Sequence, residues 1–190
     1  MDNMEKDRRL LSGYQVCLKT LEAQDLEYIY KWKNDWELAR QIKAYPLPIA
    51  ISEIQEWLKK NHLDKNQIFL GIYLKDYVSI IGVVRLKYID WISRNAELGL
   101  YIGEDKYRGR GLGKEALKLL LNYAFLEINL HKISLTVLDY NVNAIKLYES
   151  CGFTKEGVLR EQFWVNGKYE NVFLMGLLRN EYNQNILLDE

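Results

Sequence analysis

The stretch "KYRGRGLGKEA", Lys106–Ala116, decides how this sequence is interpreted. Three glycines alternate here with Arg110 and Leu112, and apolar residues then recur at helical spacing from Leu112 to Ile128. Glycine is suited to positions where the backbone turns tightly or approaches a ligand closely. The N–H groups of a first helical turn have no partner in the helix, and the helix dipole favours negative charge there. The stretch therefore predicts a site for the phosphates of a nucleotide-like cofactor, with a glycine loop that only turns the chain as the alternative.

Two known phosphate loops were compared with these residues. A Walker A loop needs glycine and a hydroxyl residue at the positions that Arg108 and Glu115 occupy, so the sequence excludes it. The segment "GLGKEA" does match the dinucleotide pattern G-x-G-x-x-A, but that fold continues as repeated parallel βαβ units. The chain instead runs into two strands joined at "VNGK", 165–168, so a dinucleotide fold is kept only as an alternative.

Composition limits the other classes of function. The 190 residues are 48% hydrophobic and 27% charged, which indicates one domain with one large core. Lys+Arg and Asp+Glu both number 26, so no overall charge draws the protein to nucleic acid or to a membrane, and neither is expected as a partner. The charged start "MDNMEKDRRL" is unlike a secretory signal, and a cytoplasmic protein with reduced thiols is expected. The two histidines have no spaced partner, so no metal site is expected.

The pattern of elements is mixed. Strands are predicted at 67–74, 79–89 and 95–103, which are rich in β-branched and aromatic residues, and a buried strand is predicted at 132–138. A further strand is expected in "YQVCLKTL", followed by helices that break at Asn34-Asp35, and a capping box at Ser52 and Gln55 starts another helix. Both prolines lie in "YPLP", 45–48, a predicted surface loop. The boundaries are a charged tail at 1–12, one domain at 13–180 and a C-terminal tail at 181–190.

Two motifs together identify a family. Arg108, Gly111 and Gly113 match a loop that reads Arg or Gln, two residues, Gly, one residue, then Gly or Ala. The segment "NVNAIKLYESCGF" matches Asn-x-x-Ala-x-x-x-Tyr-x-x-x-Gly-Phe. The sequence thus resembles the GNAT superfamily of acyl-CoA-dependent N-acyltransferases over roughly residues 14 to 178, most closely from Ala96 onward. Its end, "EGVLREQFWVNGKYENVFLM", resembles the branch of ribosomal-protein N-terminal, spermidine and amino-sugar acetyltransferases.

This resemblance implies an α+β fold and a cofactor site. The fold is a mostly antiparallel sheet with one splayed parallel strand pair, flanked by helices. The cofactor is acetyl-CoA, with its pantetheine arm against the backbone of the strand that ends at Gly103. Asn141 in the second motif contacts the cofactor or, as an alternative, only caps a helix. The residues implied to bind coenzyme A are Tyr101, Ile102, Gly103, Arg108, Gly109, Arg110, Gly111, Leu112, Gly113, Lys114, Asn141 and Ala144.

The resemblance also implies the catalytic groups. Tyr148 takes the position of the family's general acid, and a core tyrosine on an amphipathic helix is the alternative. Glu97 takes the position of a glutamate that removes the proton of the amine, directly or through water, and a solvent-facing charge is the alternative.

The acceptor is open at this stage. Trp32, Asp35 and Glu37 in "WKNDWE" offer aromatic and acidic groups for a cationic amine, although helix packing would explain them equally well. A protein N-terminal α-amine of the ribosomal-protein type is favoured, and the alternatives are spermidine, an amino sugar or an antibiotic, and a non-catalytic module that binds coenzyme A. Trp91 and Trp164 fit either a homodimer interface or the core.

Overall fold

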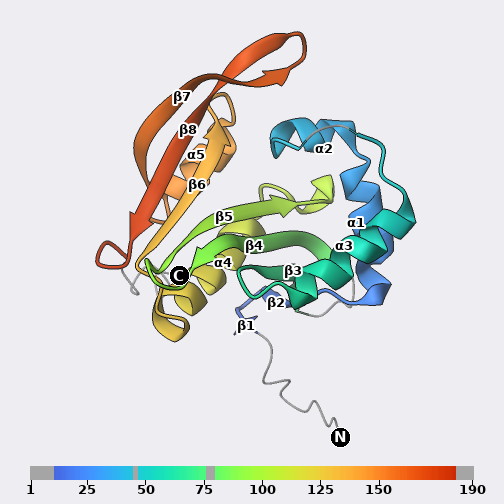
Figure 1. Cartoon of the computed structure of the whole chain (residues 1–190), viewed down its shortest axis with the longest axis horizontal. Helices are drawn as coiled ribbons and strands as arrows, with labels where there is room; N and C mark the ends of the chain where they lie inside the picture. Colours follow the sequence, from blue (N-terminus) through green and yellow to red (C-terminus); the bar gives the residue numbers. More distant parts are fainter. Residues whose placement is uncertain (1–10, 45–46, 76–79, 183–190) are drawn as a thin grey trace, which may run out of the picture.

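The computed structural model describes residues 11–44, 47–75 and 80–182, which build one sheet with helices on both faces (Figure 1). The sheet has eight strands in the order β1-β2-β3-β4-β5-β6-β8-β7. The strands are β1 Leu11–Ser12, β2 Val16–Thr20, β3 Ile68–Leu74, β4 Ile80–Asp90, β5 Asn95–Ile102, β6 Lys132–Leu138, β7 Thr154–Val165 and β8 Lys168–Leu178. The helices are α1 Leu26–Lys33, α2 Trp36–Gln41, α3 Ile51–Leu63, α4 Leu112–Asn122 and α5 Val142–Glu149, with short helical turns at Ala23–Asp25 and Asp105–Tyr107 and a π-helical turn at Tyr123–Glu127.

One pair of neighbouring strands is parallel and opens partway along its length. β5 pairs with β6 only through Asn95↔Lys132, Ala96↔Ile133 and Glu97↔Ser134. Beyond Glu97, β5 continues to pair with β4 and β6 continues to pair with β8, so the two strands diverge while each keeps its other neighbour. This confirms the predicted mostly antiparallel sheet with a splayed parallel pair, and beyond Glu97 and Ser134 the facing edges of β5 and β6 have no strand partner among the described residues.

Each face of the sheet carries its own core. On one face, α4 and α5 pack through residues such as Leu117 and Tyr148 against Leu98 and Leu135. On the other face, α1, α2 and α3 pack against the sheet through residues such as Trp32, Ile54 and Val83. Because side chains alternate along a strand, consecutive residues of β5 face different cores.

The strongest predicted elements lie where the sequence placed them. α4 begins at Leu112 and the helical turns continue through Glu127, as the apolar spacing predicted. β6 occupies the predicted range, 132–138. β7 and β8 join at Asn166 and Gly167, whose positive φ angles of 51° and 82° suit the tight hairpin predicted at "VNGK".

Some boundaries differ from the prediction. Leu11 and Ser12, included in the predicted tail, pair with β2 as β1. At the other end Tyr182 packs on Phe125 and donates a hydrogen bond to Asn122, 2.7 Å away, so the folded domain reaches past residue 180.

The helix predicted to start at Ser52 also begins earlier than expected. α3 begins at Ile51, and its cap is the carboxylate of Glu53, which accepts a hydrogen bond of 2.7 Å from the N–H of Ala50. Ser52 therefore lies inside the first turn. Of the predicted "YPLP" loop, Tyr45 and Pro46 lie outside the described residues.

Further observations concern the class of protein and the two tryptophans Trp91 and Trp164. Within the described ranges, no helix is long and apolar enough to cross a membrane, and no group of three or more His, Cys, Asp or Glu is placed to hold a metal ion. Trp91 and Trp164 are 48% and 58% exposed, so they are not core residues, and an interface role for them stays a prediction.

Candidate active site

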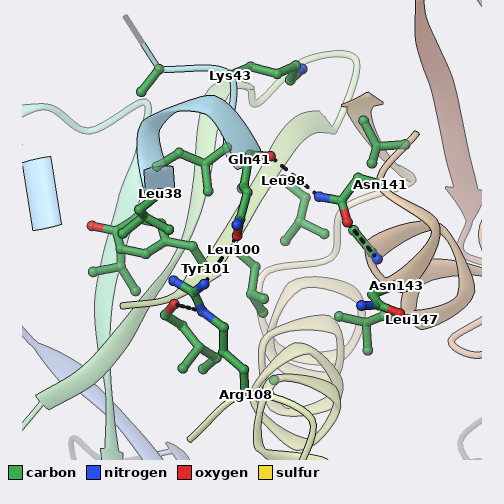
Figure 2. Close-up of a pocket in the computed structure, with 18 of the residues that line it drawn as sticks. Leu38, Gln41, Lys43, Leu98, Leu100, Tyr101, Arg108, Asn141, Asn143 and Leu147 are labelled. Carbon is green, nitrogen blue, oxygen red and sulfur yellow. Dashed lines mark hydrogen bonds between the residues drawn. The ribbon is translucent and has the colours of Figure 1, made fainter. Parts of the chain in front are cut away.

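A cavity of about 690 Å³ lies where β5 and β6 diverge (Figure 2). Its lining combines residues of β5 that face opposite sides of the sheet, such as Leu98 and Glu97, with residues of α2, α5 and the glycine loop. The cavity therefore connects the two faces of the sheet through the opening between the strands. Twelve of the predicted site residues line it: Trp32, Glu97, Tyr101, Ile102, Arg108, Gly109, Gly111, Gly113, Lys114, Asn141, Ala144 and Tyr148.

The glycine loop has the geometry of an anion site at one end of this cavity. Gly109 and Gly111 have φ angles of 71° and 79°, a left-handed conformation that glycine adopts without strain. A Cβ atom at either position would meet nothing within 4 Å, so the loop is open on the side where side chains would point. Gly111 is the N-cap of α4 and has no side chain to cap it, which leaves N–H groups of the first turn available to a ligand.

Three residues predicted to bind the cofactor are placed differently. Gly103 lies under Trp32, where a Cβ atom would come within 2.0 Å of the indole ring, so this glycine serves close packing. Leu112 points into the core and is 3% exposed, which leaves only its backbone for a ligand. Arg110 is exposed and lies outside the cavity lining.

The two acidic residues predicted to meet the amine also have other partners. Asp35 caps α2, since its Oδ1 accepts hydrogen bonds from the N–H groups of Glu37 and Leu38 at 2.9 and 3.1 Å. Glu37 forms an exposed ion pair with Arg40. Neither residue lines the cavity, whereas Trp32 does. Asp35 and Glu37 thus stabilise α2, which agrees with the alternative interpretation that this segment serves the structure of the helices.

A set of hydrogen bonds connects α2 to both sides of the opening (Figure 2). Arg108 donates from Nε to the carbonyl oxygen of Ile102 at 2.9 Å and from Nη1 to Oε1 of Gln41 at 3.2 Å, and it also pairs with Asp105 at 2.7 Å. Asn141 donates to the carbonyl oxygen of Gln41 at 3.4 Å and accepts from the N–H of Ala144 at 3.2 Å. Arg108 is therefore already held by the protein, and Asn141 is the N-cap of α5 as well as part of the cavity wall.

Tyr148 enters the cavity from the face that carries α4 and α5. It is 7% exposed, and its ring packs edge-on against Phe153 with the centroids 5.8 Å apart. Burial raises the pKa of Tyr148 to about 12, with a smaller contribution from Cys151. The hydroxyl is therefore protonated throughout the neutral range and available as a proton donor.

Glu97 lies on the opposite face, in register with Ser134 of β6 at the last pair before the strands diverge. Lys43, from the segment after α2, also lines the cavity and donates to the hydroxyl of Thr136 on β6. Burial lowers the pKa of Lys43 to about 8, the charge of Glu97 acts to raise it, and Lys87 and Arg85 lower it further. Glu97 and Lys43 therefore influence each other at the point where the opening begins.

Sequence reasoning included Arg108 and Lys114 but missed the other three cationic residues of the cavity lining, Lys33, Lys43 and Arg85. Arg85 of β4 is in register with Gly99 of β5, and a Cβ atom at Gly99 would come within 2.7 Å of its Nε. Its guanidinium carbon is 5.8 Å from the ring centroid of Phe69 on β3. These positions follow from strand register, from the packing of α1 and from the segment after α2, and no motif in the sequence marks them.

Comparisons with known proteins agree with this geometry. A family model described as an acetyltransferase (GNAT) domain matches residues 15–154. Spermidine N(1)-acetyltransferase from Vibrio cholerae serotype O1 is 34% identical over 170 residues, which cover 88% of this chain and 95% of the relative. Spermidine N(1)-acetyltransferase from Escherichia coli strain K12 is 31% identical over 171 residues, 90% of each chain.

A solved structure matches over nearly its whole length. The crystal structure of spermidine N-acetyltransferase from Vibrio cholerae in complex with CoA and spermine has a TM-score of 0.84 and 32% identity to this chain. The match covers 90% of this chain and 99% of that one.

Proposed function

This chain belongs to the GNAT acetyltransferase family and is an acetyl-CoA-dependent N-acetyltransferase, and we propose that its acceptor is the amine of a small molecule. Two relatives that span almost the whole chain are named for spermidine, which supports a small amine over the protein N-terminus favoured on sequence alone. The observation that carries the proposal is the cavity through the sheet, with Tyr148 on one face and Glu97 on the other.

We infer that coenzyme A binds at the end of the cavity formed by the glycine loop and α5. The open space beside Gly109 and Gly111 and the free N–H groups at the start of α4 fit a diphosphate. The unpaired edge of β5 beyond Glu97 fits an amide-containing arm, which adds to a strand edge by hydrogen bonds. When bound there, acetyl-CoA supplies the acetyl group as a thioester.

Tyr148 is proposed as the general acid. The departing thiolate of an acyl transfer needs a proton, and a positioned acid contributes about 10²–10⁴ in rate. Because burial raises the pKa of Tyr148 to about 12, its hydroxyl carries the proton at neutral pH. Its place in the cavity wall leaves it within reach of a ligand that enters between the strands.

Glu97 is proposed as the group that receives the proton of the amine, directly or through water. A primary amine with a pKa of about 10.4 is mostly protonated at pH 7, and its deprotonation costs about 4.6 kcal/mol. An acceptor of this kind therefore needs a base more than an α-amine with a pKa of about 7.8 does. Glu97 lies at the start of the opening and lines the cavity, which is where an amine must lose its proton before it attacks.

The experiment that tests the proposal is an amine panel. The purified chain is mixed with acetyl-CoA and, separately, with spermidine, amino sugars, amino acids and a peptide with a free α-amine, and release of the free thiol of coenzyme A is followed. We expect turnover with at least one small amine and little with the peptide. Tyr148→Phe should lower kcat about 10²–10⁴-fold and leave the affinity for coenzyme A unchanged, because only a hydroxyl is removed. Preferred turnover of the peptide would overturn the small-amine proposal.

A further inference from the structure

The part of the cavity lined by Lys33, Lys43, Arg85 and Glu97, here called the acceptor end, is strongly cationic. Lys33, Lys43 and Arg85 line it together with aromatic side chains. Among all the described residues of the lining, Glu97 is the only acidic one. This end therefore carries three positive groups against one negative group when the side chains are charged.

These cations are held in place by groups that do not neutralise them. Lys33 lies 4.5 Å from the ring centroid of Trp57, Arg85 lies over Phe69, and Lys43 donates to the neutral hydroxyl of Thr136. None of the ion pairs in the described part of the chain involves Lys33, Lys43 or Arg85.

The positive charges also repel one another. The pKa of Lys33 is lowered by burial and then by Arg85. The pKa of Lys87, two residues after Arg85 on β4, is lowered by burial and then by Arg85, while Glu97 acts to raise it. Cations that lie close together repel one another, and a ligand with negative charge offsets this repulsion and binds more tightly for that reason.

The geometry points to an acceptor that carries an anionic group, and we propose a small amine bearing a carboxylate or a phosphate. This inference rests on the proposed function and names the class of its substrate. The planar guanidinium of Arg85 can bind either anion through two parallel hydrogen bonds, with Lys33 as a second cation from α1. The amine of the same molecule would then reach Glu97, two residues before Gly99 on β5 and on the same face of the sheet.

A polycation fits this end of the cavity poorly. Spermidine would bring several positive charges beside Lys33, Lys43 and Arg85, with Glu97 alone to receive them. Like charges in a partly desolvated cavity disfavour binding, and the effect weakens as salt screens it. Discrimination between amines with and without an anion should therefore decrease at high ionic strength.

The test uses matched acceptors at pH 7.5 and constant ionic strength. Thiol release is measured with glucosamine and glucosamine 6-phosphate, with serine and serinamide, and with spermidine, so that phosphate and carboxylate are distinguished. We expect kcat/KM for at least one anion-bearing amine to exceed that of its partner without the anion and that of spermidine by about 100-fold, the size of one to two charge-assisted hydrogen bonds.

Two variants and a control locate the effect. Arg85→Gln and Lys33→Gln should each reduce that discrimination at least tenfold, mainly through KM, while calorimetry shows unchanged affinity for coenzyme A. Lys60→Gln removes the same charge from α3, where the side chain is 80% exposed, and should leave the discrimination unchanged.

The outcomes separate the two proposals. If spermidine is the best acceptor, or if Arg85→Gln and Lys33→Gln both keep the full discrimination, the anionic acceptor is refuted and the small-amine acetyltransferase stands. If no small amine of any class is acetylated, the proposed function fails and this inference fails with it.

Discussion

Replacement of Gly111 by alanine separates the fold from the cofactor site. Gly111 has φ 79° and ψ −14°, and an added Cβ would meet no atom of the protein within 4 Å. The cost to the fold is therefore conformational alone, about 1–2 kcal/mol for an L-residue in the left-handed region. In a chain of this size, 1 kcal/mol lowers Tm by about 2–4 °C, so the expected shift is roughly 2–8 °C.

Gly167 supplies a control with a similar positive φ angle. It has φ 82° in the β7–β8 turn, and an added Cβ there would also meet nothing within 4 Å. Gly167→Ala should lower Tm by a similar amount, because an L-residue is also strained at this φ angle. The two positions differ in that only Gly111 lies in the cavity wall at the start of α4.

The two variants should differ in their affinity for coenzyme A. At Gly111 the new methyl group would occupy the space assigned to the diphosphate, and a loss of about 10–100-fold, or about 1.4–2.7 kcal/mol, is expected. Calorimetric titration with coenzyme A measures this, and thermal unfolding measures the Tm of both variants. If Gly111→Ala binds coenzyme A as well as Gly167→Ala does, the assignment of the loop as the diphosphate site is refuted.

Three further changes test the acceptor side and the core. Glu97→Gln should lower kcat/KM about 10²–10⁴-fold and shift the acidic limb of the pH–rate profile, and an unshifted limb would remove Glu97 as the base. Since the pKa of Lys43 is lowered to about 8, its charge is present below pH 8 and lost above it, so KM for an anion-bearing amine should rise above pH 8 in the wild type relative to Lys43→Gln. A constant ratio of the two KM values across pH 7–9 would contradict this. Tyr73→Phe removes the 2.5 Å hydrogen bond to buried Asp25 and should lower the free energy of unfolding by about 1.5–3 kcal/mol in denaturant titration, whereas a loss below about 0.5 kcal/mol would show that the bond contributes little.

The sequence predicted most of the fold because local patterns determine it. The apolar spacing after Leu112 defines α4, the β-branched run at 132–138 defines β6, and the turn at Asn166-Gly167 defines the last hairpin. Each of these signals lies within the element that it specifies. Errors arose where a competing local signal was available, as at Ser52, where Glu53 instead caps α3 through the N–H of Ala50.

The two ends of the site differ in how far the sequence predicts them. The glycine loop and the motif around Tyr148 each lie within a single segment, so the spacing of residues in that segment is enough to predict them. The acceptor end draws Lys33 from α1, Lys43 from the segment after α2 and Arg85 from β4. Their proximity depends on the register between β4 and β5 and on how α1 packs against the sheet. No single segment of the sequence specifies either of these.

The opening between β5 and β6 is what brings the two proposed catalytic residues to one cavity. Side chains alternate along a strand, so Glu97 faces α1–α3 while its neighbour Leu98 faces α4. Tyr148 packs on the α4 face, and a sheet in which β5 and β6 stayed paired would separate it from Glu97 by a continuous layer of backbone. Because pairing ends at Glu97↔Ser134, the layer is open from Leu98 onward, and a donor held on one face can meet an amine that enters from the other. In the proposed function, the unpaired strand edges bind the donor, and the opening between them places the proposed acid and the proposed base in one cavity.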